Sequence, residues 1–477
     1  MPTLQTHITL LISASLFLTG CNNNLAKSPD SSFIKIDNEN SLIIGLYEYP
    51  DDENKLTDAA NAGFNLIHSS PDAAQLDKIN SLGLKAWISL DLNANSPQKI
   101  DNITTTVNSL KNHPALLIWE APDEILWYNW YPAFDYFSNI ELKQMKQIAE
   151  STDPSQARLL SQYQKVEDAL KRALWQNLET ERQKFWHIAQ QSPQNPNLKI
   201  SDALQNSQTT LTSLTEGVKT LKSLDPNHPV WLNHAPRNSL KSLTAYNIPF
   251  DIVGCDIYPI PHATSAGHSD LISPYPSCVG LYTDRMIKSA PNKSCFMILQ
   301  GFNWKSLNEL SAAPENPDQP QPDKTPNLRE TRFMAHNALM HGANAIIYWG
   351  TFTIDRNSQL WKDILQVASE LRSLEPAILA PQIAPTVIST AHETLNSIDP
   401  QDAPLVQVKK VGPDFFIFAA NETISPVPFT ISNLPHELEG KTLYRLYTHE
   451  SHTIKNLSLT DGIRPFDIHI YTTQSHR

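Results

Sequence analysis

The stretch ALLIWEAPDE, residues 115–124, decides the fold of this chain. Its first five residues are apolar, and carboxyl side chains follow at Glu120, Asp123 and Glu124. A short apolar run without alternation is typical of a strand that is buried on both faces of a parallel sheet. Such a strand needs helices on both sides, so the stretch predicts an α/β architecture with polar side chains gathered at the carboxyl end of the strand.

Seven further runs have the same character and alternate with helical segments, two of which end in Gly63 and Gly83. The seven runs are residues 41–49, 64–70, 84–92, 228–236, 250–261, 294–302 and 343–352. Eight strands in this order predict a (β/α)8 TIM barrel over residues 41–378, with the site at the carboxyl ends of the strands. The alternative is an open doubly wound sheet, which lacks the expected G-x-G-x-x-G after its first strand.

Two segments fall outside this regular alternation. Residues 128–208, after the fourth strand, have near-helical spacing of apolar residues and predict a helical insertion. A proline-rich boundary near residues 376–385 precedes strand-like runs separated by turns. Residues 379–477 are therefore expected to form a small, β-sandwich-like module.

The N-terminus is expected to be an export signal. Leu10 to Leu18 is an apolar run of the length found in signal peptides, and it is too short to span a bilayer. Leu18, Thr19, Gly20 and Cys21 resemble the lipobox of bacterial lipoproteins. The resemblance implies cleavage after residue 20 and a lipid such as palmitate on Cys21. The polar residues that follow predict a flexible tether over residues 21–40. The resemblance also implies a membrane-anchored envelope location, and the residue after the cysteine, Asn22, favours the outer membrane.

The composition limits the possible partners. The net charge of −12 argues against nucleic acid and is compatible with a neutral polysaccharide. No histidine, cysteine or carboxylate group has metal-ligand spacing, so we expect neither a metal nor another cofactor. Cys255, Cys278 and Cys295 leave open whether one pair forms a disulfide.

One segment carries a family resemblance. HPALLIWEAPDE, residues 113–124, resembles the fourth-strand motif W-E-x-x-N-E-P of the cellulase-like clan of retaining glycoside hydrolases. Trp119, Glu120, Asp123 and Glu124 match its W, E, N and second E. LDPNHPVW (224–231), DIVGCDIYP (251–259) and GANAIIYWG (342–350) extend the resemblance over the barrel. The resemblance implies a glycoside hydrolase in which Glu124 is the general acid/base. We expect Glu120, facing inward, to be a hydrogen-bonded structural residue.

The chain departs from the family at the end of strand seven, where Gln300 replaces the nucleophilic glutamate. Glycosidic cleavage needs a protonated carboxyl group and a second, ionised one. Asp123 and Asp256 are the principal candidates for the second carboxylate, and Glu48 and Asp91 also end strands. An adjacent Asp-Glu pair additionally resembles enzymes in which a 2-acetamido group of the substrate is the nucleophile.

Further side chains at predicted strand ends and in the following segments are candidates for sugar binding. They are Glu48, Asp91, Trp127, Trp130, Asn233, Tyr258, Gln300, Trp304 and Trp349. Packing against the inserted helices is the alternative role for Trp127 and Trp130. The sequence thus favours a hydrolase of poly- or oligosaccharides. A carbohydrate-binding lipoprotein that has lost its nucleophile, and a structural interaction protein of the envelope, are the two alternatives.

Overall fold

The computed structural model describes residues 33–50, 52–151, 156–172, 175–195, 202–262, 273–310, 323–383, 386–392 and 403–475. The expected signal peptide and Cys21 lie outside these residues. Among the described residues, no helix has both the length and the apolar character needed to cross a membrane.

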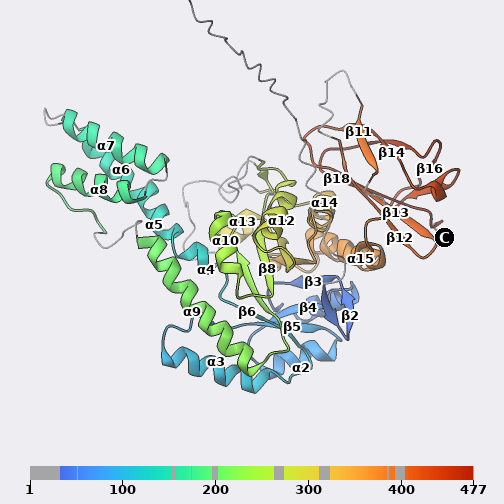
Figure 1. Cartoon of the computed structure of the whole chain (residues 1–477), viewed down its shortest axis with the longest axis horizontal. Coiled ribbons are helices and arrows are strands. Elements are labelled where there is room, and N and C mark those ends of the chain that lie inside the picture. Colours follow the sequence, from blue (N-terminus) through green and yellow to red (C-terminus); the bar gives the residue numbers. More distant parts are fainter. Residues whose placement is uncertain are drawn as a thin grey trace, which may run out of the picture.

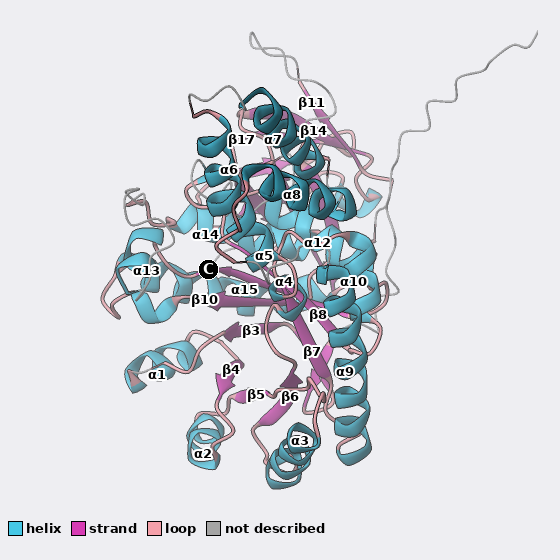
Figure 2. Cartoon of the chain, turned by 90° about the vertical axis from the view of Figure 1, so that its left-hand side faces the viewer, coloured by secondary structure: helices cyan, strands magenta, loops and turns pink. Residues whose placement is uncertain are grey.

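Eight parallel strands close into a barrel in the order β10-β3-β4-β5-β6-β7-β8-β9, with helices around the outside (Figure 2). The strands are β3 (Ile43–Leu46), β4 (Leu66–Ser69), β5 (Lys85–Ser89), β6 (Leu116–Glu120), β7 (Val230–His234), β8 (Ile252–Ile257), β9 (Ser294–Gln300) and β10 (Ala345–Trp349). Each overlaps one of the eight predicted runs. The TIM-barrel prediction is therefore confirmed, and the open doubly wound sheet is excluded by the pairing of β10 with β3.

The barrel is a packed core because side chains alternate between its inside and its helical coat. Inside, Trp87, Trp231 and Phe296 pack with aliphatic residues, and the Trp87 and Trp231 rings lie 5.5 Å apart. Outside, a larger apolar cluster joins the strands to the helices. These helices are α1 (Glu53–Asn61), α2 (Ala73–Ser81), α3 (Pro97–Leu110), α9 (Ala203–Leu224), α10 (Leu240–Asn247), α12 (Cys278–Ser289), α14 (Leu328–Met340) and α15 (Gln359–Leu379).

Local sequence sets where several of these helices begin. Asp72, Ser96 and Ser358 each accept a backbone N–H at a helix start, as N-cap residues do. Asn327 and Glu330 form a reciprocal capping box at the start of α14. These caps satisfy backbone donors that have no partner within the helix, so they fix where each βα connection ends.

A hairpin lies at the amino-terminal end of the barrel, opposite the expected site. β1 (Ile34–Ile36) pairs antiparallel with β2 (Glu39–Ser41), and Ile34 and Ile36 pack against the barrel interior. The tether expected over residues 21–40 therefore includes an ordered hairpin from residue 34. The barrel half-buries the apolar side chains of Ile34 and Ile36, so the polarity of the segment does not reveal the hairpin.

The expected insertion after β6 is helical. It contains α4 (Ile125–Tyr128), α5 (Tyr131–Tyr136), the π-helix η1 (Phe137–Glu141), α6 (Leu142–Ala149), α7 (Gln156–Lys171) and α8 (Trp175–Ala189). Helices α6 to α8 share an apolar cluster separate from the barrel core. In Figure 1 they project from one side of the barrel.

The C-terminal module consists of two antiparallel sheets, as expected, and lies on the other side of the barrel (Figure 1). The small sheet contains β11 (Ile388–Ala391), β14 (Val427–Ser432) and β17 (Leu459–Ile463). The large sheet contains β12 (Leu405–Val411), β13 (Asp414–Asn421), β18 (Asp467–Thr472), β15 (Thr442–Arg445) and β16 (Ser451–Thr453). One apolar cluster joins the two sheets, and a second joins the large sheet to α14 and α15.

Candidate active site

Four carboxyl groups gather at the carboxyl ends of the barrel strands, and we call them the carboxyl cluster: Glu120, Asp123, Glu124 and Asp256. Glu120 ends β6, Asp123 and Glu124 follow it, and Asp256 lies on β8. Asn233 on β7 donates from Nδ2 to Asp123 Oδ1 at 2.9 Å and to Asp256 Oδ1 at 3.4 Å. The barrel therefore brings Asp123, Glu124, Asp256 and Asn233 together, although they come from three strands far apart in the sequence.

Glu124 has an unusual backbone conformation. Its φ of +49° lies in the left-handed region, which residues with a Cβ atom seldom adopt. Its carbonyl oxygen accepts hydrogen bonds from Trp127 N at 2.8 Å and Tyr128 N at 3.2 Å, at the start of the short helix α4. Strain of this kind is often found at functional sites, where surrounding structure holds it in place. Here it turns the chain so that Glu124 reaches Asp256.

The Glu124 and Asp256 carboxyl groups share a hydrogen bond. Burial raises the pKa of Glu124 well above its ordinary value, and the nearby charges of Asp256 and Asp123 raise it further. Burial and the charge of Asp123 also raise the pKa of Asp256. Because the pKa of Glu124 is raised more, Glu124 carries the shared proton and donates it to Asp256.

Asp123 is the most exposed residue of the carboxyl cluster, but its carboxyl group faces inward, and burial raises its pKa as it does for the other members. Within the described residues, no lysine or arginine forms an ion pair with any member of the carboxyl cluster. Hydrogen bonds from Asn233 and Tyr47 act against this burial and lower the pKa of Asp123, which favours Asp123 as the ionised member.

Glu120 is held by three donors. Its carboxyl oxygens accept hydrogen bonds from the Tyr47 and Ser89 hydroxyls and, at 3.1 Å, from Trp87 Nε1. Burial and the charge of Asp123 raise the pKa of Glu120 to about 8. The Tyr47 hydroxyl also hydrogen-bonds Asp123, so it connects the two carboxyl groups. Sequence reasoning missed Tyr47, Trp87 and Ser89; the available signal was their place within the strand runs 41–49 and 84–92.

Aromatic rings line one side of the barrel mouth. The rings of Tyr258 and Trp349 are stacked with centroids 5.2 Å apart, and Phe302 meets both edge-on. Trp304 packs against Tyr258 and Phe302. Three of the predicted sugar-binding residues, Tyr258, Trp304 and Trp349, therefore lie together in one cluster.

Trp127 and Trp130 pack between the insertion and the barrel loop that follows β7. The Trp127 ring stacks on Tyr131 at 3.8 Å, and the Arg237 guanidinium lies 5.8 Å from both ring centres. Trp130 Nε1 donates to Asn238 Oδ1 at 3.0 Å. This arrangement corresponds to the packing role that the sequence left open for these two residues.

The remaining candidates lie apart from the carboxyl cluster. The amide of Gln300 is buried, donates to the carbonyl oxygens of Ile260 and Phe302, and accepts from Ile260 N. Asp91 is exposed and pairs with Lys99 at 2.9 Å. Glu48 accepts from the Thr351 hydroxyl at 2.6 Å, and burial raises its pKa to about 7. Gln300 therefore bonds backbone atoms, Asp91 forms a surface ion pair, and Glu48 bonds a residue just after β10.

The three cysteines are buried free thiols, and no disulfide links them. In the described part of the chain, the one group with atoms close enough to share a metal ion is Glu450, His452 and Asp461, in the C-terminal module. Arg445 Nη1 already lies 2.7 Å from Glu450 and 3.3 Å from Asp461, which leaves these carboxylates paired with a cation.

No protein-family model and no curated protein matches this chain by sequence. Solved structures do match. A glycoside hydrolase family 5 structure from Bacteroides vulgatus aligns with a TM-score of 0.51 and 10% identity, over 93% of this chain and 92% of that chain. Gan42B, a GH42 β-galactosidase from G. stearothermophilus, aligns with a TM-score of 0.50 and 10% identity, over 92% and 98%.

The chain shares its TIM-barrel fold with these two glycoside hydrolase structures. At 10% identity the likeness establishes the fold and no more, so the chemistry has to be argued from the carboxyl cluster itself. The chain spans only part of some of the structures it matches: it covers 60% of a β-galactosidase from the psychrophilic Marinomonas ef1, with a TM-score of 0.43, 14% identity and 70% of this chain covered.

Proposed function

We propose that this protein is a glycoside hydrolase in which Glu124 is the general acid. The supporting observation is the hydrogen bond between Glu124 and Asp256, in a cluster that pairs with no cation among the described residues, because this arrangement keeps a proton on Glu124 near neutral pH. A proton donor with a raised pKa at the mouth of a barrel is what cleavage of a glycosidic bond requires. In the aromatic cluster, the half-buried rings of Trp304 and Trp349 are the ones available to a sugar, because Tyr258 is buried against Trp349.

Asp123 is our candidate for the second carboxylate. Asp256 hydrogen-bonds Glu124 directly, so the two groups are closer than the roughly 5 Å that separates the pair in a retaining glycosidase. Asp256 is therefore better suited to controlling the proton of Glu124. Asp123 is oriented by Asn233 and Tyr47. An oriented aspartate beside the acid could also position a 2-acetamido group of the substrate.

The test is the release of reducing sugar from a panel of neutral oligosaccharides by wild-type protein and by Glu124→Gln. Glutamine keeps the shape of the side chain and removes its proton, so we expect turnover to fall by about 10²-fold or more while binding persists. Asp91→Asn is the matched control, because Asp91 is an exposed carboxylate after the neighbouring strand. Equal turnover in Glu124→Gln and wild type would rule out Glu124 as the acid.

A non-catalytic carbohydrate-binding protein is the second candidate. It is favoured by Gln300, which by sequence resemblance takes the place of the nucleophilic glutamate of retaining glycoside hydrolases and whose amide bonds only backbone atoms in the described chain. Binding of an oligosaccharide by the wild type without release of reducing sugar would support this candidate. A panel that shows neither binding nor release would reject both.

We also propose that the protein is anchored to the outer membrane through a lipid on Cys21. The support is the apolar run before this cysteine and the four residues that resemble a lipobox. Cys21→Ala should move the protein from the membrane fraction to the soluble fraction. A Cys21→Ala protein that stays in the membrane fraction would disprove the anchor.

A further inference from the structure

A groove of about 770 Å³ runs along the junction between α15 and the C-terminal module, outside the barrel mouth. Its walls come from the C-terminal half of α15, from β13 and β15, from the turn that follows β15, and from the end of the chain. The lining residues are Ser373, Leu374, Phe416, Tyr444, Leu446, Tyr447, Thr448, His449, Glu450 and Gln474. The volume lies within the range of small-molecule sites in proteins.

Tyr447 is the most unusual residue of this groove. It lies in the turn between β15 and β16, is 47% exposed, and has a φ of +64°. A bulky side chain in the left-handed region is rare. Asn or Gly would suit such a turn better, and the exposed ring of Tyr447 gains little from the core. The conformation therefore holds an aromatic ring at the surface, outside the apolar clusters of the module.

The ring of Tyr447 is fixed from the barrel side. The Arg332 guanidinium on α14 lies 4.8 Å from the ring centre. Glu370 on α15 holds that guanidinium with two hydrogen bonds of 2.7 Å. A planar arginine clamped in this way is a rigid support for an aromatic ring. The ring is thus preorganised before any ligand arrives, which lowers the entropic cost of binding.

The chemistry of the lining selects the class of ligand. Aromatic rings of Phe416, Tyr444 and Tyr447 alternate with polar side chains, and lysine and arginine are absent from the residues that line the groove. Within the described part of the chain, the Tyr447 hydroxyl and the His449 imidazole have no hydrogen-bond partner. Flat apolar faces beside unpaired polar groups match the two faces of a pyranose ring. The two arginines next to the lining are already paired, Arg332 with Glu370 and Arg445 with Glu450, which disfavours an anionic ligand.

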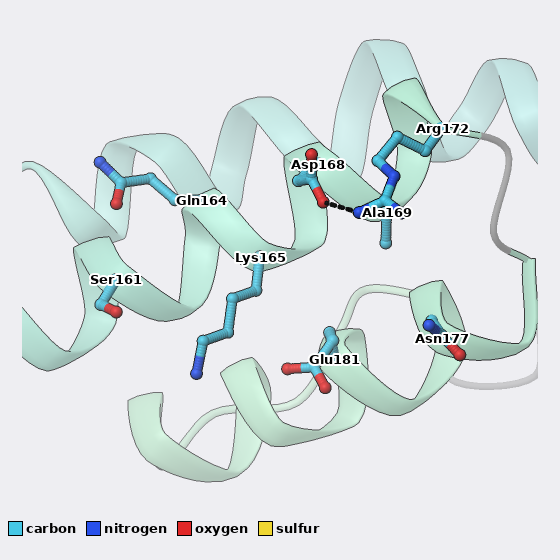
Figure 3. Close-up of a pocket in the computed structure, with 8 residues that line it drawn as sticks. All are labelled: Ser161, Gln164, Lys165, Asp168, Ala169, Arg172, Asn177 and Glu181. Carbon is cyan, nitrogen blue, oxygen red and sulfur yellow. Dashed lines mark hydrogen bonds and ion pairs between the residues drawn. The ribbon is translucent and has the colours of Figure 1, made fainter. Parts of the chain in front are cut away.

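A second groove provides a contrast. The groove between α7 and α8, of about 500 Å³, is lined by polar and charged side chains and by Ala169, without an aromatic ring (Figure 3). Its charges include the ion pair of Arg172 with Asp168 at 3.1 Å. Similar size therefore does not imply similar chemistry, and the aromatic surface is specific to the groove at the module.

We propose that the groove at the module is an accessory binding site for neutral oligosaccharide, with Tyr447 as the stacking platform. The choice of a sugar as ligand rests on the proposed function. A glycan chain held here would keep the protein on its polymeric substrate while the barrel mouth acts on a chain end or a neighbouring chain.

The test uses an array of neutral hexasaccharides built from glucose, xylose, mannose, galactose or N-acetylglucosamine. The protein is the soluble Cys21→Ala form carrying Glu124→Gln, so that bound chains stay intact. Tyr447→Gly removes the ring and tolerates a φ of +64°, so the fold should persist. We expect it to weaken binding of the recognised hexasaccharide by about tenfold or more, since a stacked aromatic contact contributes on this scale.

Two further variants sharpen the result. Tyr447→Phe keeps the ring and should retain most of the affinity. Ile424→Gly is the matched control, because Ile424 is an exposed apolar residue of the same module outside the groove. With Glu124 intact, Tyr447→Gly should leave the hydrolysis of a disaccharide substrate unchanged while it lowers activity on a polysaccharide.

The outcomes separate this site from the proposed hydrolase. The accessory site is disproved if the Tyr447→Gly variant binds every hexasaccharide as tightly as the protein that keeps Tyr447. It is also disproved if no hexasaccharide binds at all. Both conclusions are independent of what the barrel hydrolyses. If Tyr447→Gly weakens binding but the protein with Glu124 intact releases no reducing sugar, the accessory site stands and the hydrolase proposal fails.

Discussion

Two parts of this molecule bury glutamate side chains and stabilise them in opposite ways. In the insertion, Glu141 is fully buried and receives Arg182 Nε at 2.6 Å, Arg182 Nη2 at 3.0 Å and Trp186 Nε1 at 2.6 Å. In the barrel mouth, the carboxyl cluster has hydroxyl, amide and indole donors, and no cation pairs with it in the described chain.

The difference shows what each part is arranged to do. An arginine beside a buried carboxylate cancels its charge permanently, so the Glu141 pair fastens the insertion and offers no proton for chemistry. Carboxyl groups that crowd together without a cation raise one another's pKa values and must share protons. This crowding costs stability, but it keeps an acid protonated at neutral pH.

The largest expected effect comes from removing the arginine that pairs with Glu141. Arg182→Met should destabilise the insertion by about 3–5 kcal/mol, because Glu141 would remain as a buried charge without a partner. Thermal unfolding followed by circular dichroism would measure the loss. Arg172→Met is the matched control, since its ion pair with Asp168 is exposed and should leave Tm unchanged. Equal Tm values for Arg182→Met and wild type would show that the pair is not a fastening element.

The next effect concerns Gln300. Gln300→Ala leaves the N–H of Ile260 and the carbonyl groups of Ile260 and Phe302 without their partner, which should cost about 1–3 kcal/mol for a buried unsatisfied group. Turnover should fall far less than in Glu124→Gln. Gln300→Glu should destabilise the protein more than alanine does, because its carboxylate would face two carbonyl oxygens. An increase of turnover in Gln300→Glu would show instead that this side chain reaches the substrate.

A third test concerns a single acid outside the carboxyl cluster, Glu48. Its pKa of about 7 in the folded protein lies above the ordinary 4.5. Between these pH values the folded chain holds a proton that the unfolded chain releases, so stability falls as pH rises, by about 1.4 kcal/mol per unit. Glu48→Gln should remove this slope and should be more stable than wild type at pH 8. Identical pH profiles of Tm for the two proteins would contradict the raised pKa.

The smallest effect is a shift in the pH dependence of catalysis. Asp256→Asn removes a charge and a hydrogen bond that raise the pKa of Glu124. The alkaline limb of kcat/KM should therefore move to lower pH, by about one unit or more. Asn233→Ala is a useful companion, because it should disturb the orientation of Asp256 while keeping its charge. Loss of turnover at every pH in Asp256→Asn would indicate that Asp256 is itself the second carboxylate.

Local sequence predicted much of the fold. Each barrel strand is an apolar run with its own turn signals, so all eight could be located from residues a few positions apart. The insertion and the module were predicted for the same reason. The hairpin of β1 and β2 was missed because its apolar residues alternate over three positions only, and most of the barrel residues that half-bury them are distant in sequence.

The candidate site was predicted less completely. Glu124, Asp123, Asp256 and Asn233 could be named because each ends or follows a strand run, and in a TIM barrel such positions converge. The contacts of these side chains could not be predicted. Gln300 faces the loop after β8 and binds its backbone, and Asp91 faces solvent and binds Lys99, although both end strand runs as Asp256 does.

The sequence alone determined the order and number of the strands and the place of Glu124 at the end of the fourth. Periodicity and turn residues act over short distances along the chain. Eight strands that alternate with helices are typical of one closed parallel sheet. Only the tertiary structure decided that Glu124 shares a proton with Asp256, 132 positions further along the chain. The reason is physical: a pKa depends on burial and on the charges a few ångströms away, and barrel closure alone sets those distances.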